Sequence, residues 1–161
     1  TMCIVPSSIR LNLDKINEYY SRNGVTQVVM TTHLARMYAT TLTPPASIRY
    51  LMLGGETLVP VDAPDGYEMI NVYGPTECTI YTTSFSLDEN NKRARIPVGK
   101  PLDNFRLYVA DSEGRQLPIG AIGELWACGP QVSRGYLNRP ATSCVCSLTE
   151  MWISLVEGTA R

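Results

Sequence analysis

The stretch Asn71-Val72-Tyr73-Gly74-Pro75-Thr76-Glu77 decides how this chain is interpreted. Within a few residues it places an amide, an aromatic ring, a Gly-Pro turn, a hydroxyl and a carboxylate. These groups suit a nucleotide, because a ring can stack on a base and an amide can read its edge. A hydroxyl can donate to a phosphate, and a carboxylate can bind Mg²⁺. A strand that only filled a core would not need these polar groups at its end.

Before this stretch, segments with helical spacing alternate with short apolar runs. We expect one helix near 11–20, capped by Asn12 or Asp14 and followed by Gly24, and a second after Thr31-Thr32. We expect strands over 3–6, 25–30, 49–53 and 67–73. This alternation predicts a mostly parallel α/β sheet over residues 1–83.

After the stretch the pattern changes to short alternating segments. We expect strands over 82–87, 105–110 and 124–127, with a hairpin turn at 111–114. Prolines at positions 97, 101 and 118 punctuate these segments. The pattern predicts antiparallel, barrel-like β structure as a second subdomain over residues 84–140.

Composition limits the functional classes. The net charge is −1, with 14 Lys+Arg and 15 Asp+Glu, so we do not expect a nucleic-acid polymer as partner. No apolar run reaches the ~18 residues of a membrane span, and the N-terminus shows no signal-peptide pattern. The five cysteines include no Cys-x-x-Cys pair, and Cys144-Val145-Cys146 has no second ligand pair for zinc. We therefore expect a cytoplasmic protein without a membrane partner, whose cysteines are buried or idle thiols.

Residues 71–77 resemble the Asn-x-Tyr-Gly-Pro-Thr-Glu signature of acyl-adenylate-forming enzymes, specifically the adenylation domains of nonribosomal peptide synthetases. Other segments that resemble the same family occur in the same order: Gly54-Gly55-Glu56, 96–102, 117–120, Gly123-Glu124-Leu125 and the Arg134-Gly135-Tyr136 of 129–137. The resemblance covers residues 1–140. It implies a partial acyl-adenylate-forming large domain.

The resemblance also implies an activity and its cofactors. The family joins a carboxylic acid to ATP with Mg²⁺, and then transfers the acyl group to a phosphopantetheine thiol on a peptidyl carrier domain. By position, Tyr73 stacks adenine, Asn71 contacts its exocyclic amine, Thr76 contacts phosphate and Glu77 binds Mg²⁺. Thr76 and Glu77 are thus the expected catalytic residues. The expected nucleotide site also includes Gly54, Gly55, Glu56 and Gly74.

The same resemblance implies a pocket for an amino acid or related acid. Its expected wall consists of Val29, Met52, Gly54, Val72, Ile80 and Tyr81. This set is mostly apolar with one phenol, so we expect an acid with a neutral, fairly apolar side chain.

Several family segments are expected to lie outside these residues, including the phosphate loop and the Tyr-Arg-Thr-Gly-Asp segment. We therefore expect the chain to be a central fragment that does not catalyse the reaction alone. Residues 141–161 depart from the family pattern, as a shifted reading frame or an insertion would explain. The alternatives are an inactive remnant or simple nucleotide-binding fragment, and a relative that activates fatty or aryl acids.

Overall fold

The computed structural model describes residues 1–61, 65–87, 96–138, 146–147, 150–151 and 153–155. The chain forms two compact units. The first contains Thr1–Asn71 and Ser86–Ile96, and the second contains Val72–Phe85 and Pro97–Arg161. Most of the tail 141–161, which we expect to be aberrant, lies outside the described residues.

Two helices of the first unit begin where the sequence predicts. Helix α1 (Leu13–Arg22) follows Asn12, whose side chain accepts a hydrogen bond from the Lys15 amide at 3.0 Å. Helix α2 (Thr32–Thr41) follows Thr31, which makes no such side-chain bond. The rings of Tyr20 and Tyr38 meet edge to face, 6.2 Å apart, and so pack α1 against α2.

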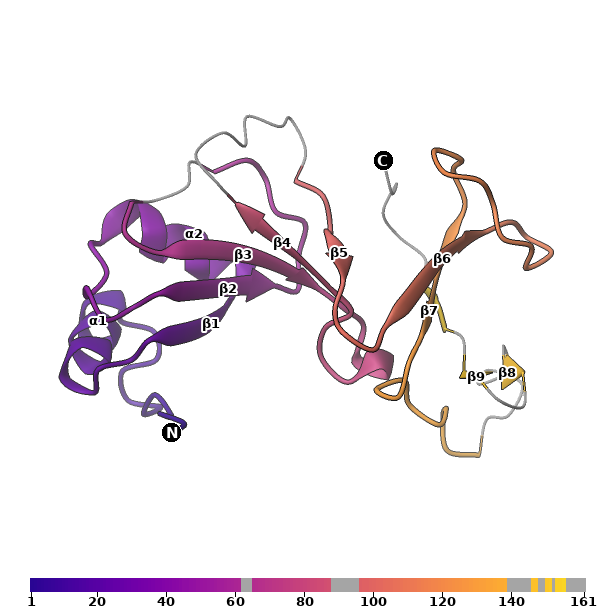
Figure 1. Cartoon of the computed structure of the whole chain (residues 1–161). Coiled ribbons are helices and arrows are strands. Elements are labelled where there is room, and N and C mark those ends of the chain that lie inside the picture. The colour runs from indigo at the N-terminus through magenta and orange to yellow at the C-terminus, as the bar shows by residue number, and fades with distance from the viewer. Residues whose placement is uncertain (62–64, 88–95, 139–145, 148–149, 152, 156–161) are drawn as a thin grey trace. The chain divides into compact units, whose positions relative to one another are not determined.

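The first two strands of the first unit pair in parallel, as predicted. Strands β1 (Gln27–Thr31) and β2 (Tyr50–Gly54) pair in parallel, and β3 (Glu68–Tyr73) follows in the strand order β1-β2-β3-β4-β5 (Figure 1). Strand β4 (Thr83–Leu87) in turn pairs antiparallel with β5 (Lys100–Pro101).

The pleat of β1 and β2 separates a buried face from an open face. The buried side chains are Val28, Met30, Leu51 and Leu53, and α2 contacts both strands. Val29 and Met52 are paired in register on the opposite face, where Val29 is 58% exposed. Helix α2 thus covers the buried face of this strand pair.

The strand predicted over residues 3–6 is wrong. Cys3 and Ile4 are exposed and form no strand. The Ile4 carbonyl instead accepts a hydrogen bond from the Tyr19 hydroxyl at 3.0 Å. A short apolar run does not form a strand without a ladder partner.

The second unit has an antiparallel sheet, as predicted. Strands β6 (Arg106–Ala110), β7 (Glu124–Cys128) and β10 (Ile153–Leu155) lie in the order β10-β7-β6. Strands β8 (Cys146–Ser147) and β9 (Glu150–Met151) form a separate pair. The core of this unit is the cluster of Cys78, Phe105, Ala127 and Val132.

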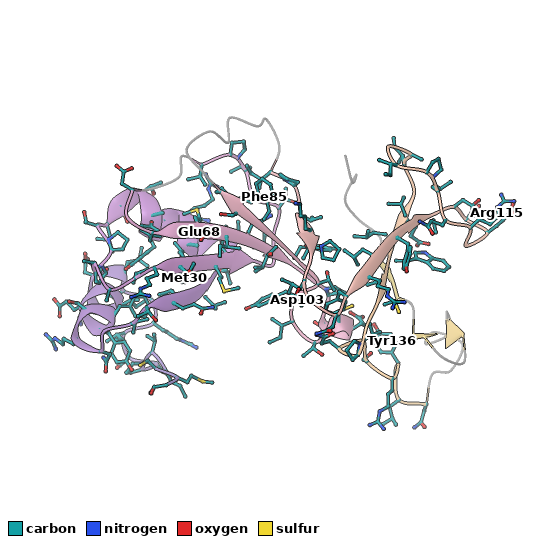
Figure 2. All side chains as sticks on the ribbon, in the orientation of Figure 1. Met30, Glu68, Phe85, Asp103, Arg115 and Tyr136 are labelled. Carbon is teal, nitrogen blue, oxygen red and sulfur yellow. The ribbon has the colours of Figure 1, made fainter. Side chains whose placement is uncertain are left out.

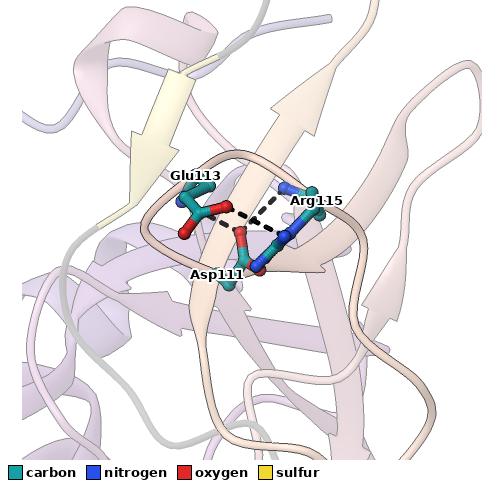
Figure 3. Close-up of polar contacts among 3 residues, drawn as sticks. All are labelled: Asp111, Glu113 and Arg115. Atoms are coloured by element: carbon teal, nitrogen blue, oxygen red, sulfur yellow. Dashed lines mark hydrogen bonds and ion pairs between the residues drawn. The ribbon is translucent and has the colours of Figure 1, made fainter.

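The predicted turn after β6 is confirmed. The Gly114 amide donates to the Asp111 carbonyl at 3.0 Å. The Arg115 side chain pairs with Asp111 at 2.8 Å and Glu113 at 2.9 Å (Figure 3). Backbone and side-chain hydrogen bonds from Arg115 lower the pKa of Asp111. The Asp111 oxygens are therefore occupied by their own turn.

None of the helices in the described ranges has the length and apolar character needed to cross a membrane.

The two faces of β1 predict opposite effects of the same substitution at neighbouring valines. Val28→Ala should lower the free energy of unfolding by about 1–3 kcal/mol, because Val28 is 3% exposed and its loss leaves a cavity. Val29→Ala should change it by less than about 0.5 kcal/mol, because Val29 is exposed. Urea unfolding of both variants measures the difference. Equal destabilisation by the two substitutions would contradict this assignment of faces.

Candidate functional site

The stretch from Tyr73 to Thr82 is a closed loop within the second unit. The Tyr73 carbonyl accepts hydrogen bonds from the Thr82 amide at 2.8 Å and the Thr82 hydroxyl at 3.1 Å. A Cβ added at Gly74 would lie 2.5 Å from the Tyr81 Cα, so only glycine fits there. The close approach that Gly74 allows is therefore to the returning arm of the loop itself.

A short 3₁₀ helix, η1 (Thr76–Cys78), forms the tip of this loop. The Cys78 amide donates to the Pro75 carbonyl, and the Thr79 amide donates to the Thr76 carbonyl, both at 3.0 Å. The Thr76 side chain is exposed on the first residue of this turn. Its hydroxyl is accessible to a ligand from solvent.

The ring of Tyr73 is half-buried at the end of β3. It packs against the cluster of Cys78, Phe105, Ala127 and Val132. One side of the ring is thus anchored in the core of the second unit. A base can stack only on the part of the ring that remains accessible.

Glu77 is half-buried, and it carries an ionised carboxylate at neutral pH. The hydrogen bond from the hydroxyl of Tyr136, which Figure 2 labels, to Glu77 Oε1 is the largest cause of the lowered Glu77 pKa. A backbone hydrogen bond adds to the effect. The bond between Tyr136 and Glu77 also raises the pKa of Tyr136, because it stabilises the protonated phenol.

The donor set at Glu77 fits a magnesium ion that also binds a nucleotide. Mg²⁺ in such sites is held by one or two carboxylates and by phosphate oxygens. The described residues contain no cluster of three or more His, Cys, Asp or Glu side chains. An ion at Glu77 would therefore need oxygens from a ligand to complete its coordination.

Cys78 is an inert neighbour of Glu77. It is 1% exposed, and burial together with the Glu77 charge raises the pKa of its thiol to about 11. A thiol that stays protonated is neither a nucleophile nor a soft-metal ligand. The prediction of a buried, idle thiol is confirmed for Cys78.

The remaining residues that are predicted to bind the nucleotide belong to the first unit. Asn71 is buried at 6% exposure, whereas Gly55 and Glu56 are exposed. Gly55 has φ +97°, and an added Cβ would meet no atom within 4 Å. The Thr32 hydroxyl donates to the Glu56 carbonyl at 3.2 Å and ties this turn to α2. The backbone at Gly55 is therefore open to a flat ligand.

The predicted pocket residues divide between the two units. Val29, Met52 and Gly54 share one face of the β1–β2 pair in the first unit, as the parallel register requires. In the second unit, Val72 is buried at 4% exposure, Tyr81 is half-buried and Ile80 is 60% exposed. Only the first-unit group is brought together by a shared register, and the pocket as a whole stays a prediction.

Sequence reasoning missed the partners of the Thr76–Thr79 turn. This turn forms one hydrogen bond with each of three later residues, which are Gln131, Ser133 and Tyr136. The only signal in the sequence was the Arg134-Gly135-Tyr136 segment, which belongs to a family motif but suggested no partner.

Comparisons with known proteins agree with the resemblance. The family model described as AMP-binding enzyme matches residues 1–137. Bacitracin synthase 1 of Bacillus licheniformis is 35% identical over 87% of this chain, and a linear gramicidin synthase of Brevibacillus parabrevis is 34% identical over 87%. Malpibaldin synthetase of Mortierella alpina is 35% identical over 98%. The chain spans 3% of the length of each of these relatives.

The contact between Tyr136 and Glu77 predicts a measurable shift in acidity. Tyr136→Phe removes the largest cause of the lowered pKa, so the pKa of Glu77 should rise toward its ordinary value of 4.5. An NMR titration of the side-chain carboxyl carbons measures this change. The lowered pKa of Asp111 is the internal control, because Arg115 and not Tyr136 causes it.

The sign of the linked stability effect follows from both pKa shifts. Because the pKa of Glu77 is lowered in the folded chain, its contribution is complete above the unfolded pKa and is lost as pH falls through the folded pKa. Because the pKa of Tyr136 is raised in the folded chain, its contribution to stability is complete below the unfolded pKa. That contribution is lost as pH rises through the folded pKa. The stability difference between the wild type and Tyr136→Phe should therefore shrink at both extremes; a difference independent of pH would contradict the contact.

Proposed function

Since the chain belongs to the AMP-binding enzyme family, we propose that it is the central part of an adenylation domain in a nonribosomal peptide synthetase. The parent enzyme is an ATP-dependent ligase that activates an amino acid or related carboxylic acid. The relatives with printed names such as bacitracin synthase 1 and malpibaldin synthetase support this proposal. Their lengths also support a role for this chain within a much larger protein.

One observation supports this function above the others. The loop from Tyr73 to Thr82 presents the exposed Thr76 hydroxyl and the ionised Glu77 carboxylate in a single closed turn after β3. Ligands of open α/β sheets bind beyond the carboxyl ends of strands, where this turn lies. A hydroxyl donor and a carboxylate suit a phosphate and its counter-ion.

The proposed reaction follows from these groups. An oxygen of the substrate carboxylate bonds to the α-phosphorus of ATP, the bond from that phosphorus to the bridging oxygen breaks, and pyrophosphate leaves. Thr76 would donate to a phosphate oxygen, and Glu77 would hold Mg²⁺. Bound there, Mg²⁺ would neutralise the charge that develops on the phosphates. The acyl-adenylate would then react with the phosphopantetheine thiol of a peptidyl carrier domain and release AMP.

Base recognition is proposed for Tyr73 and the first-unit residues. The accessible part of the Tyr73 ring would stack adenine, which contributes about 1–3 kcal/mol. Asn71 would contact the exocyclic amine, and Gly54, Gly55 and Glu56 would flank the base. The open space beside Gly55 supports this assignment.

A neutral, fairly apolar acid is the proposed substrate class. Val29 and Met52 are apolar and adjacent on the open face of the β1–β2 pair, which supports their role as pocket wall. The proposed wall would also include Gly54, Val72, Ile80 and Tyr81. The proposed location is the cytoplasm, which the cysteine pattern supports.

The second candidate is nucleotide binding without turnover. The 161 residues contain no Gly- and Thr-rich phosphate loop that ends in lysine. Glu77 therefore stands without the main partner expected for a triphosphate. This favours weak nucleotide binding by the isolated chain and catalysis only by a longer protein.

The proposed stacking predicts the response of AMP binding to changes at Tyr73. Tyr73→Leu keeps apolar contact with the core cluster but removes the aromatic face, so AMP affinity should fall about 5- to 150-fold. Tyr73→Phe is the matched control and should retain affinity. Titration of the chain with AMP, followed by NMR shifts of residues 73–82, gives both constants. Equal affinity of all three proteins would remove Tyr73 from the nucleotide site.

Pyrophosphate exchange separates the two candidate functions. A synthetase that contains this chain should exchange pyrophosphate into ATP with neutral apolar amino acids, and Glu77→Gln should lower the rate at least about tenfold. The purified 161-residue chain should show only background exchange.

The outcomes are distinct. Exchange by the purified chain well above background would show that the piece is an enzyme by itself. Preferential exchange with Asp or Lys would refute the proposed pocket. A longer protein that binds AMP but exchanges nothing would favour the nucleotide-binding alternative.

A further inference from the structure

The loop after β7 is hydrogen-bonded to the turn that contains Thr76 and Glu77. The Ser133 amide donates to the Glu77 carbonyl at 2.6 Å, and the Thr79 hydroxyl donates to the Gln131 carbonyl at 2.7 Å. The Tyr136 hydroxyl donates to Glu77 Oε1. These contacts link residues more than fifty positions apart in sequence, and all of them lie within the second unit.

The turn that these bonds hold has a strained backbone. Thr79 has φ +74° and ψ −67°, and the Ile80 amide donates across it to the Cys78 carbonyl at 3.0 Å. This is the geometry of the γ-turn with positive φ, which is rare and strained. Thr79 is also β-branched, and such residues seldom adopt positive φ. A conformation of this kind persists only where surrounding contacts determine it.

The loop after β7 is itself held in place. The Val132 amide donates to the Gly129 carbonyl at 3.1 Å and closes a turn, and Val132 is buried in the core cluster of this unit. The loop is therefore held by its own turn and by the core cluster, in addition to its bonds to Glu77 and Thr79. It can act as a fixed support for the strained turn.

We propose that residues 129–136 form a clasp that holds the Thr76–Thr79 turn in its strained conformation, with Tyr136 as the positioning residue of the Glu77 carboxylate. The role of the clasp in metal and nucleotide binding rests on the proposed function. The two backbone-directed bonds fix the course of the main chain at Glu77 and Thr79. The phenol fixes one carboxylate oxygen, and so determines where the second oxygen points.

The clasp would order the Glu77 carboxylate before any ligand binds. Without the phenol, the carboxylate could rotate about its terminal torsion, which is broad for glutamate. An ordered ligand loses less conformational freedom when an ion binds. Tyr136 therefore acts through Glu77 and need not touch the substrate.

Hydrogen exchange of one amide tests the clasp in the full 161-residue chain. Thr79→Val removes the hydroxyl bond to Gln131 while keeping the branched shape, and should speed exchange of the Ser133 amide about fivefold to tenfold. Thr79→Ser keeps the hydroxyl and should stay within about twofold of the wild type. The Leu102 amide, which donates to the Thr82 carbonyl at 2.9 Å, is the reference in the same unit.

Tyr136→Phe provides a second variant that should fold normally, because the Tyr136 side chain is 51% exposed. It should move the Glu77 side-chain carboxyl resonance and weaken the scalar coupling through the hydrogen bond from Ser133 nitrogen to Glu77 carbonyl carbon. Leu102 exchange should not change. A merely stabilising role would speed Ser133 and Leu102 exchange equally.

The results that would overturn the clasp are specific. One is an unchanged hydrogen-exchange rate of the Ser133 amide in Thr79→Val. Another is an equal acceleration of exchange at the Ser133 and Leu102 amides. The third is a Glu77 side-chain carboxyl resonance that does not move in Tyr136→Phe. AMP titration of the same samples keeps the two proposals separate. Loss of AMP binding in every sample with an intact exchange pattern would refute the proposed function and leave the clasp as a structural finding.

Discussion

The Tyr73 carbonyl oxygen accepts two hydrogen bonds from Thr82, and the geometry of the candidate site depends on this closure. It joins the end of β3 to the start of β4, so the residues between them must form a tight loop. The loop can close only because Gly74 leaves room for the backbone of Ile80 and Tyr81. Thr76 and Glu77 are thereby presented at its tip, rather than extended along a strand.

Two neighbouring residues in this loop show how burial decides acidity. Glu77 remains partly exposed, so hydrogen-bond donation from Tyr136 prevails over desolvation and lowers its pKa. Cys78 is almost fully buried, so desolvation prevails and raises its pKa to about 11. The 3₁₀ turn points one side chain outward and the next one inward. The same few residues therefore supply an ionised carboxylate and a neutral core thiol.

Local sequence patterns predicted the helices and most strands because the physical causes are local. Asn12 caps α1 through its own side chain, and the apolar residues of β1 alternate between two faces. The 3–6 segment failed because a strand needs a neighbour, which composition cannot provide. Among the candidate site residues, the polar groups of 71–77 were identifiable from their chemistry. The partial burial of Tyr73 was not, since it depends on packing against a cluster that includes Phe105 and Val132 from distant segments.

The family, the order of the elements and the residue types suited to a nucleotide and its metal ion are all contained in the linear sequence. They follow from local spacing and from a motif whose members are close together in the chain. Three further facts emerge only from the folded chain: Tyr73 is half-covered by the core, Gly74 serves the loop's own closure, and Tyr136 meets Glu77. Each of these facts depends on how the backbone returns on itself around the signature loop. The contacts of Tyr73 and Glu77 join segments far apart in the chain, and no local pattern contains that information.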